Sequence, residues 1–482
     1  MLKHPFSSRL LTIVLFLNCL ACGSSSKLTT QASVTPYNVL FIAVDDLNDW
    51  VGFLGGHPQA KTPNLDRLAA RSMVFEKAYC VVPACSPSRV ALLTGMSPNT
   101  TGIYHNNNDM WQSLRIREKA ISLPKYFSQH GYFTTAKGKL FHASQGKRAE
   151  PDQWDRFHKL TGRSIAVHPD KTETVLASGM PVESNKDKNL DWGVIENVFL
   201  EESQDFKTAQ FVAEELLKPH DKPFFLGCGI FRPNLPWYLP KGFVEQFPLD
   251  DIQLPTIKED DLDDIPEIGR KMAKGLDSKS DYQRLKKYGK LKEAVQAYLA
   301  SMKYADDCLG VVLDALDKSA YKDNTIIVLW GDHGWHLGEK LHYRKFALWE
   351  EANRVPLLIY QPGMEAGQKC TRPVSLLDIY PTLTELCKLP PNSNTDGQSL
   401  VPLLNNPKRS WERPAISTMG YQQHSVRDER YRYIRYSDGS EELYDHDNDP
   451  HEWTNLALDV GYKSIINKLK KWLPRENVEE VR

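Results

Sequence analysis

The chain has 482 residues, a net charge of −1, 41% hydrophobic residues and 25% charged residues. This length is too great for one ordinary domain and allows a large core with a smaller domain beside it. The balanced charge excludes the strongly basic surface that nucleic acids and anionic membranes attract, so we expect no nucleic-acid partner.

The first 23 residues have the pattern of a secretory signal peptide. Two basic residues precede an apolar run over residues 10–20, and small residues follow. The run is too short for a transmembrane anchor, and no later stretch is apolar enough to span a bilayer. Cys22 could also accept a lipid anchor, although Cys19 stands where a lipoprotein signal usually has an aliphatic residue. We expect a signal peptide over 1–23, a linker over 24–36, and a protein that is periplasmic, secreted or an outer-membrane lipoprotein.

Two apolar runs end in paired polar residues. Residues 37–46 and 325–333 are too continuously apolar for one-sided strands, which predicts strands covered on both faces of a parallel sheet. The terminal pairs are Asp45–Asp46 and Asp332–His333. Ligands of open α/β sheets bind at the carboxyl ends of strands, and adjacent carboxylates repel each other unless a cation lies between them. The pattern therefore indicates a cation site at this edge.

Residues 85–89, Cys-Ser-Pro-Ser-Arg, predict a short exposed turn that opens a helix. Pro87 suits the first helical position, and residues 90–93 form an apolar run that is compatible with a helix. A cysteine at a helix start meets backbone N–H groups and the positive end of the helix dipole. Such a cysteine, taken alone, is more often a small buried hydrophobic residue.

Strand and helix patterns alternate through most of the chain. Further strands are expected over residues 132–136, 223–230 and 355–360, and helices over 209–217 and 294–316. This alternation predicts an α/β fold, with a large mixed, mainly parallel sheet sandwiched by helices.

Two regions depart from the alternation. Residues 240–290 carry dense charge, and we expect a surface insertion near the mouth of the site with solvated charges. After the linker-like residues 405–413, short strands separated by turn residues predict a small antiparallel α+β subdomain. We divide the chain into a catalytic domain over 37–405 and a C-terminal subdomain over 406–482.

The segment Cys85-x-Pro87-x-Arg89, followed by a helix and Leu-Thr-Gly95, resembles the signature of the type I sulfatases, and the pattern is nearest to the iduronate-2-sulfatase-like members. The resemblance covers most of the chain after about residue 37. It implies an alkaline-phosphatase-like fold and hydrolysis of sulfate esters. In that family a maturase oxidises the cysteine to formylglycine, whose hydrated form attacks sulfur. The maturase is therefore an expected partner.

The resemblance also implies a set of metal ligands. They are Asp45, Asp46, Cys85, Asp332 and His333. An oxygen-rich set of this kind suits one Ca²⁺ ion, although a histidine ligand leaves room for another divalent ion.

Four further residues match the catalytic positions of the family. Arg89 would steady the nucleophile, Lys139 would bind the sulfate and His142 would act as a base. Lys345 matches a second sulfate-binding lysine, with Lys340 as an alternative.

One position departs from the family pattern. Asn234, in the loop Arg232–Pro236, stands where the iduronate type has a histidine that is proposed to protonate the leaving oxygen. Asparagine can donate a hydrogen bond but cannot supply the proton. Lys345, His336 or His342 would then have to serve as the acid, or turnover would be slow.

The expected export and the resemblance favour sulfated polysaccharides or oligosaccharides as substrates. The candidate sugar contacts are His105, Asn106, Asn234, Trp237, His336, His424 and Arg427. Two alternatives stay open at this point. One is a phosphonate monoester or phosphodiester hydrolase of the same superfamily, and the other is a secreted glycan-binding protein with a weakened site.

Overall fold

A computed structural model of the chain describes residues 36–142, 152–165, 168–183, 189–274 and 280–481. The expected signal peptide and Cys22 lie outside the described residues. From residue 36 onward the chain forms one unit by its contacts. The boundary after residue 405 stays a prediction.

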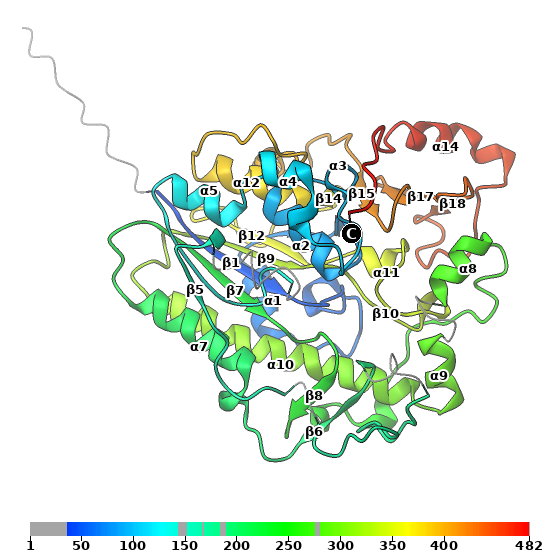
Figure 1. Ribbon diagram of the computed structural model, residues 1–482, viewed down its shortest axis with the longest axis horizontal. Helices are drawn as coiled ribbons and strands as arrows, with labels where there is room; N and C mark the ends of the chain where they lie inside the picture. Colours follow the sequence, from blue (N-terminus) through cyan, green and yellow to red (C-terminus); the bar gives the residue numbers. More distant parts are fainter. Residues whose placement is uncertain (1–35, 143–151, 166–167, 184–188, 275–279, 482) are drawn as a thin grey trace, which may run out of the picture. The chain divides into compact units, whose positions relative to one another are not determined.

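Eight strands form the central sheet, in the order β13-β2-β12-β9-β1-β7-β4-β5 (Figure 1). Their bounds are β1 Asn38–Val44, β2 Met73–Phe75, β4 Phe133–Gly138, β5 Arg156–His158, β7 Phe224–Ile230, β9 Thr325–Gly331, β12 Leu357–Tyr360 and β13 Lys369–Cys370. β1 is parallel to both β7 and β9, and β4 is parallel to β7 and β5. Only β12 among these eight runs antiparallel to its neighbours, so the predicted mixed, mainly parallel sheet is confirmed.

The two faces of the central sheet bury separate cores. Along β1, residues Val39, Phe41 and Ala43 belong to one core, whereas Leu40, Ile42 and Val44 belong to the other. This alternation follows from the period of two in a strand, and it explains why the run is apolar without interruption.

Helices cover both faces of the sheet, as Figure 1 shows. One side carries α2 Cys85–Thr94, α4 Leu114–Lys119, α5 Leu123–Gln129 and α12 Ile379–Leu386. The other side carries α1 Pro63–Ala69, α7 Gln204–Leu217 and the 28-residue α10 Leu291–Lys318. The helices expected over 209–217 and 294–316 are therefore confirmed, each a few residues longer.

The C-terminal residues form a four-stranded antiparallel sheet with one helix packed on it. The elements are β15 Ala415–Thr418, β16 His424–Arg427, β17 Tyr431–Arg435, β18 Glu441–Asp445 and α14 Lys463–Lys470. Val426, Tyr433 and Leu443 pack there against Ile466 and Leu469. The small antiparallel subdomain predicted from the turn-rich composition is confirmed as a structure.

Shorter α-helices and strands occur elsewhere in the described part of the chain. They are α3 Pro98–Thr101, α8 Glu267–Ala273, α9 Asp281–Lys287, α11 Glu350–Asn353 and α13 Val401–Asn405, with the strand pairs β3 Ala78–Tyr79 and β14 Val374–Ser375, β6 Trp192–Ile195 and β8 Trp237–Pro240, and β10 His336–Leu337 and β11 Tyr343–Arg344. Helices α8 and α9 belong to the charged region 240–290.

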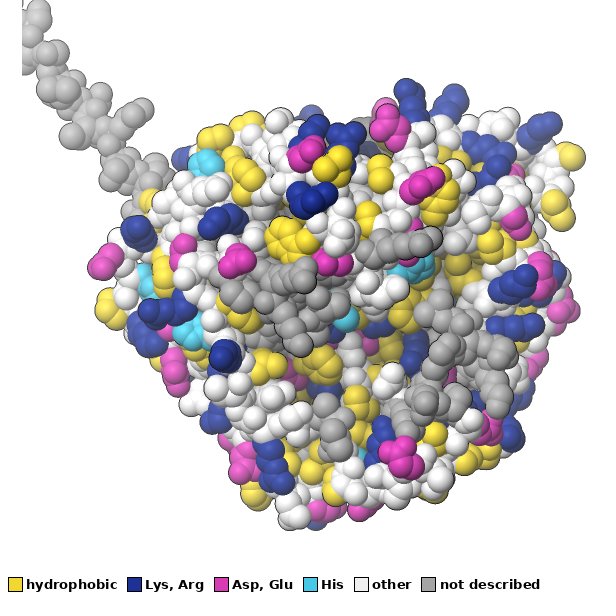
Figure 2. Space-filling view, in the orientation of Figure 1, with side chains coloured by type: hydrophobic (Ala, Val, Ile, Leu, Met, Phe, Trp, Pro, Cys, Tyr) yellow, Lys and Arg dark blue, Asp and Glu magenta, His cyan; other side chains and the backbone are white. Residues whose placement is uncertain are grey.

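The surface matches the balanced charge of the sequence. On the face in Figure 2, acidic and basic side chains of the described residues are interspersed. Among the helices of the described residues, none combines the length and the apolar character that crossing a membrane requires.

Candidate active site

The polar pairs of the sequence meet at one edge of the central sheet. β1 lies between β7 and β9 and is parallel to both, so Asp45 and Asp332 follow neighbouring strands in the same direction. The backbone N–H of Asp46 donates to Oδ1 of Asp332 at 3.0 Å. Asp46 has a φ of 59°, so the chain turns in a left-handed conformation directly after Asp45.

Helix α2 brings Cys85 to this edge. The helix begins at Cys85 rather than at Pro87, and all ten of its residues are buried. Cys85 is 2% exposed, so the expected exposed turn was wrong. The reason is that the polar side of the helix also faces protein: Ser88 donates its hydroxyl to the backbone carbonyl of Asp332 at 2.6 Å.

The sulfur of Cys85 lies among the predicted ligands. Sγ is 3.2 Å from Nε2 of His333, 3.7 Å from Oδ1 of Asp46 and 2.8 Å from Nζ of Lys345. Nδ1 of His333 lies 3.0 Å from the carbonyl of Gly334. Because a carbonyl only accepts, Nδ1 carries the proton and Nε2 presents its lone pair to the site.

Arg89 joins three strand ends from the centre of the site. Its fully buried guanidinium donates to Asp332 at 2.8 Å and to Asp45 at 3.0 Å. It also donates to the carbonyl of Leu140 at 3.0 Å, just after β4. Charge-assisted bonds of this kind are strong and directional, so Arg89 fixes the two carboxylates in place.

β4 ends in a glycine that allows Lys139 to reach the site. Gly138 has a φ of 91°, and a side chain there would overlap the carbonyl of Gly229. Nζ of the next residue, Lys139, bonds to Oδ2 of Asp45. Burial, reinforced by the charges of Lys139 and Lys345, lowers the pKa of His142 to about 3. His142 is therefore neutral at pH 7, the form that can accept a proton.

The carboxylates of the site differ in how well their charge is compensated. Burial raises the pKa of Asp45 to about 7, although Lys139 opposes this effect. Against the same penalty of burial, Arg89 holds the pKa of Asp332 well below its usual range. Burial lowers the pKa of His333 to about 4, so its imidazole is neutral. The charges of Lys139 and Arg89 thus only partly offset the burial of Asp45.

The donor set fits a divalent cation. Asp45, Cys85, Asp332 and His333 each offer a ligand atom, and these atoms all lie within 4.8 Å of one another. Oδ2 of Asp46 is buried and has no hydrogen-bond partner among the described residues. A buried carboxylate oxygen without a partner is costly unless a cation completes its environment.

Asn234 points into the site from the loop after β7. Its Nδ2 donates to Oδ2 of Asp45 at 2.5 Å and lies 4.0 Å from Sγ of Cys85. The residue that departs from the family pattern, Asn234, therefore lies beside Cys85.

The structure excludes Lys340 from the sulfate-binding position, because its Nζ bonds to Asp261 at 2.8 Å. His342 is also excluded as the missing acid. Both of its ring nitrogens lie 2.8 Å from carbonyls, those of Ala273 and Lys345. His336 is fully buried, and its ring packs against that of His342.

Several expected sugar contacts are wrong because their side chains are buried in other interactions. The indole of Trp237 donates to the carbonyl of Pro233 at 2.6 Å and packs against Tyr298 and Trp335. Arg427 lies 3.4 Å from Glu350. His336 is withdrawn for the burial already described.

The remaining expected contacts divide between structural and exposed positions. His424 is buried and bonds to the hydroxyl of Thr418 at 2.9 Å, so it is withdrawn as well. Asn106 accepts from the backbone N–H of Ser86 at 2.9 Å and thereby holds the start of α2. His105 is partly exposed, 3.9 Å from Glu480, and stays a prediction.

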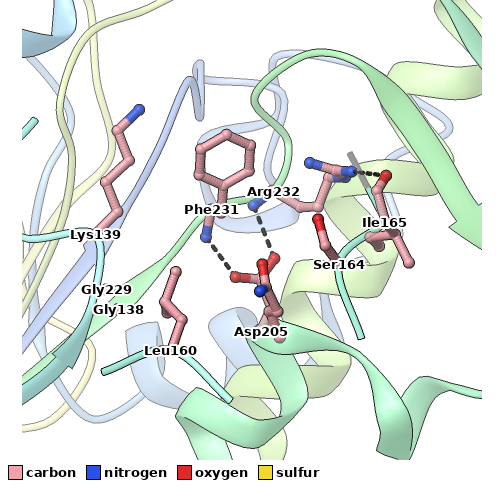
Figure 3. Close-up of a pocket in the computed structure, with 10 residues that line it drawn as sticks. Gly138, Lys139, Leu160, Ser164, Ile165, Asp205, Gly229, Phe231 and Arg232 are labelled. Atoms are coloured by element: carbon pink, nitrogen blue, oxygen red, sulfur yellow. Dashed lines mark hydrogen bonds between the residues drawn. The ribbon is translucent and has the colours of Figure 1, made fainter. Parts of the chain in front are cut away.

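A cavity of about 220 Å³ adjoins Lys139 (Figure 3). Apolar side chains of Leu160, Ile165 and Phe231 line it, and the ring of Phe231 lies 4.9 Å from Nζ of Lys139. Asp205, at the start of α7, accepts from the backbone N–H groups of Phe231 and Arg232 on the same side. The cavity therefore offers an apolar surface beside a cation of the site.

Tyr298 was not among the residues expected at the site. Its hydroxyl donates to the carbonyl of Asp46 at 2.8 Å and accepts from the N–H of Asn48 at 3.0 Å. It holds the turn that carries the ligand pair. The only signal was a residue with a polar tip within the apolar stripe of a long helix.

Comparisons with known proteins agree with this geometry. The sequence profile named Sulfatase matches residues 37–389, and the profile for the C-terminal part of N-sulphoglucosamine sulphohydrolase matches residues 331–479. A sulfatase from Formosa agariphila is 39% identical over 95% of this chain and 90% of its own. Human iduronate 2-sulfatase is 31% identical over 79% of this chain and 74% of its own.

Solved structures share the fold. A phosphonate monoester hydrolase from Agrobacterium radiobacter aligns with a TM-score of 0.74 and 21% identity, over 90% of this chain and 94% of its own. A protein solved with its substrate D-glucosamine-2-N,6-O-disulfate aligns with a TM-score of 0.68 and 21% identity, over 91% and 97%.

Proposed function

The chain belongs to the sulfatase family and is a sulfuric ester hydrolase, and we propose that it releases sulfate from sulfated saccharides by means of a formylglycine made from Cys85. The observation that carries this proposal is the position of Cys85. Its sulfur lies within hydrogen-bonding distance of both His333 and Lys345, at the edge where three carboxylates converge.

The environment of Cys85 argues against an unmodified thiol as the nucleophile. Burial raises the pKa of the thiol far above its usual value, although Lys139 and Lys345 oppose this effect. A protonated thiol is a weak nucleophile. When formylglycine is present and hydrated, it supplies a hydroxyl group that can attack sulfur.

We propose that one Ca²⁺ ion is held by Asp45, Asp46, Asp332, His333 and the oxidised residue 85. Oxygen ligands predominate in this set, as Ca²⁺ prefers. The ion would polarise a sulfate oxygen. Three carboxylates face the three cations Arg89, Lys139 and Lys345, so a divalent ion gives the site a formal excess of two positive charges. That excess favours an anionic ester.

Residues of the chain itself would bind the sulfate group, accept the proton and contact the leaving oxygen. Lys139 and Lys345 would bind sulfate oxygens once a cation has taken over the carboxylates. Against burial, which lowers it, Asp46 raises the pKa of Lys345, so this lysine retains its charge. Neutral His142 would accept a proton from the nucleophile, and the amide of Asn234 would donate a hydrogen bond to the leaving oxygen.

The saccharide part of the proposal rests on the relatives and on the cavity beside Lys139. A sugar ring could lie against Phe231 while its sulfate reaches Lys139. Export by the segment 1–23, in a lipid-anchored form at Cys22 or a free form, and a maturase that oxidises Cys85 complete the proposal.

Phosphonate or phosphate ester hydrolysis is the alternative to test alongside. The likeness to the phosphonate monoester hydrolase is at 21% identity and supports the fold alone. No contact in the described site favours that chemistry over sulfate.

The deciding experiment combines mass spectrometry with substrate comparison. Protein co-expressed with a maturase should show formylglycine in the peptide 80–89 and should release sulfate from defined sulfated saccharides faster than phosphonate from matched esters. A thiol fully retained in active enzyme would contradict the mechanism. A preference for phosphonate would contradict the substrate class.

A further inference from the structure

The loop that carries Lys345 has a strained backbone. Lys340, Leu341, Arg344 and Phe346 have φ values of 55°, 50°, 73° and 71°, in the left-handed region that non-glycine residues rarely occupy. Such conformations persist only when the surrounding structure imposes them, and they concentrate at functional sites. Four of them within seven residues indicate that strong contacts hold this loop in a specific shape.

Lys340 makes the most deeply buried of these contacts. Its Nζ lies 2.8 Å from Oδ1 of Asp261, and both side chains are 2% exposed. The same ammonium donates to the backbone carbonyl of Glu452. Its position is therefore defined by two distant parts of the chain, the charged insertion and the C-terminal subdomain. A buried lysine needs such partners, because an unpaired charge there is very unfavourable.

Two further contacts hold the other end of the loop. Nε of Arg344 lies 2.5 Å from Oδ2 of Asp281, at the start of α9. The ring nitrogens of His342 each lie 2.8 Å from a carbonyl, that of Ala273 in α8 and that of Lys345 itself, and the single N–H of the neutral ring donates to one of them. Helices α8 and α9 thus contact the loop directly, and they belong to the region whose charges were expected to be solvated. That expectation was wrong for Asp261.

Together these contacts fix the position of one ammonium group, that of Lys345. Nζ of Lys345 lies 2.7 Å from Asp46 and 2.8 Å from Sγ of Cys85, and the backbone N–H of the next residue donates to the carbonyl of Pro83 at 3.0 Å. Errors of about 1 Å at a reacting centre can cost about a hundredfold in rate. The loop therefore needs a rigid support.

We propose that Lys340 is a positioning residue: by joining Asp261 of the insertion to the carbonyl of Glu452 in the C-terminal subdomain, it holds the strained loop so that Lys345 meets the sulfate group. This inference rests on the proposed function. It assigns the insertion and the C-terminal subdomain a shared role in substrate binding, although neither supplies a ligand to the site described above.

The first test is Lys340→Met in the matured, metal-loaded enzyme. We expect kcat/KM for an aryl sulfate to fall by about 10- to 100-fold and the Kd of inorganic sulfate, measured by calorimetry, to rise about tenfold. The matched control is Lys258→Met, which removes a partly exposed lysine of the same insertion whose Nζ lies 3.1 Å from Asp260. It should leave both values unchanged.

A second variant separates positioning from stability. Lys340→Met with Asp261→Asn removes both buried charges, so the melting temperature should recover toward that of the wild type. Activity and sulfate affinity should stay low, because the link to the loop is still missing. Recovery of activity together with stability would overturn the inference.

A double-mutant cycle with Lys345→Met tests whether Lys340 acts through Lys345. If Lys340 acts through Lys345, Lys340→Met should cause little further loss in the Lys345→Met background. Additive losses in kcat/KM and in sulfate affinity would overturn the inference while leaving the proposed function intact. Wild-type activity of Lys345→Met alone would instead refute the role of Lys345 in the proposed function, and with it the inference.

Discussion

In the described part of the chain, two clusters bring carboxylates and a histidine together, the first fully buried and the second partly buried. One surrounds Cys85, and the other joins Glu350, His446 and Glu452 near the C-terminal sheet; each offers ligand atoms within 4.8 Å of one another. In the second cluster, Arg432 contacts Glu350, and its Nε lies 2.5 Å from Glu452. In the first, Oδ2 of Asp46 has no hydrogen-bond partner among the described residues.

The pKa values of the carboxyl groups reflect this difference. Against the penalty of burial, Arg432 lowers the pKa of both Glu350 and Glu452. In the cluster around Cys85, burial prevails and raises the pKa of Asp45 to about 7. Arg432 therefore pairs with both carboxylates of one cluster, whereas in the other Arg89, Lys139 and Lys345 leave Oδ2 of Asp46 without a partner among the described residues and do not offset the burial of Asp45. Acid and histidine residues in proximity do not by themselves identify a metal site.

The largest expected effect comes from removing the sulfur that only the first cluster contains. Cys85→Ala should lower kcat/KM by about 10⁴-fold or more, because no side chain there can become the nucleophile. The melting temperature should change little. Cys387→Ala is the control, since this buried cysteine lies in the core and should affect stability alone. Substantial turnover by Cys85→Ala would remove the basis of the comparison.

Metal removal should distinguish the two clusters next. Chelation, or Asp46→Ala, should reduce activity by about a hundredfold or more and lower the melting temperature. A ligand present at 100 times its Kd stabilises the folded state by about 2.7 kcal/mol, and this contribution would be lost. Glu452→Gln should leave the response to metal unchanged. A loss of the calcium response in Glu452→Gln instead of Asp46→Ala would reverse our assignment.

Asn234→His tests the departure beside the first cluster. A general acid contributes roughly 10²–10⁴ in rate, so a histidine there should raise turnover of saccharide sulfates if the acid is missing. Aryl sulfates should respond little, because their leaving groups need no proton. If the variant instead loses saccharide turnover and keeps aryl sulfate turnover, Asn234 recognises the substrate.

The pH dependence of metal affinity should follow Asp45. Below its pKa of about 7, a proton competes with the cation for this carboxylate. The affinity for Ca²⁺ should therefore weaken by up to about tenfold per pH unit as the pH falls from 7 to 5, in calorimetric titrations. An affinity that is constant over this range would contradict the raised pKa.

The smallest effect on catalysis should come from breaking the second cluster. Arg432→Met leaves Glu350 and Glu452 buried without their main cation, which should cost about 3–5 kcal/mol of stability. The kcat/KM of the protein that remains folded should be unchanged. Denaturant unfolding and active-site titration together measure the two quantities. A fall in kcat/KM with unchanged stability would show that the clusters are not independent.

The parts of the fold that could be predicted are those encoded by local pattern. The apolar run of β1 and the stripe of α10 predicted their elements, and Asp45, Asp46, Asp332 and His333 do converge because parallel strands end at the same edge. The burial of α2 was missed, since its polar residues bond to strand ends that lie far away in the sequence.

Residues whose role depends on a distant partner could not be predicted. Trp237 has the residue type of a sugar contact, but its ring packs on Tyr298, 61 positions away in the sequence. Lys340 was a plausible sulfate ligand by spacing, and only the structure reveals its partner Asp261. The residue type defines which interactions a side chain can make, whereas its neighbours in the fold determine which of them it makes.

The central place of β1 also bears on how the enzyme is inactivated. This strand is paired on both sides and buried on both faces, so its backbone amides should exchange with solvent only when the whole unit unfolds. Asp45 and Asp46 directly follow that strand. The edge of the sheet that carries these two carboxylates therefore cannot unfold separately from the rest of the unit. The loss of activity on heating should follow the rate of global unfolding.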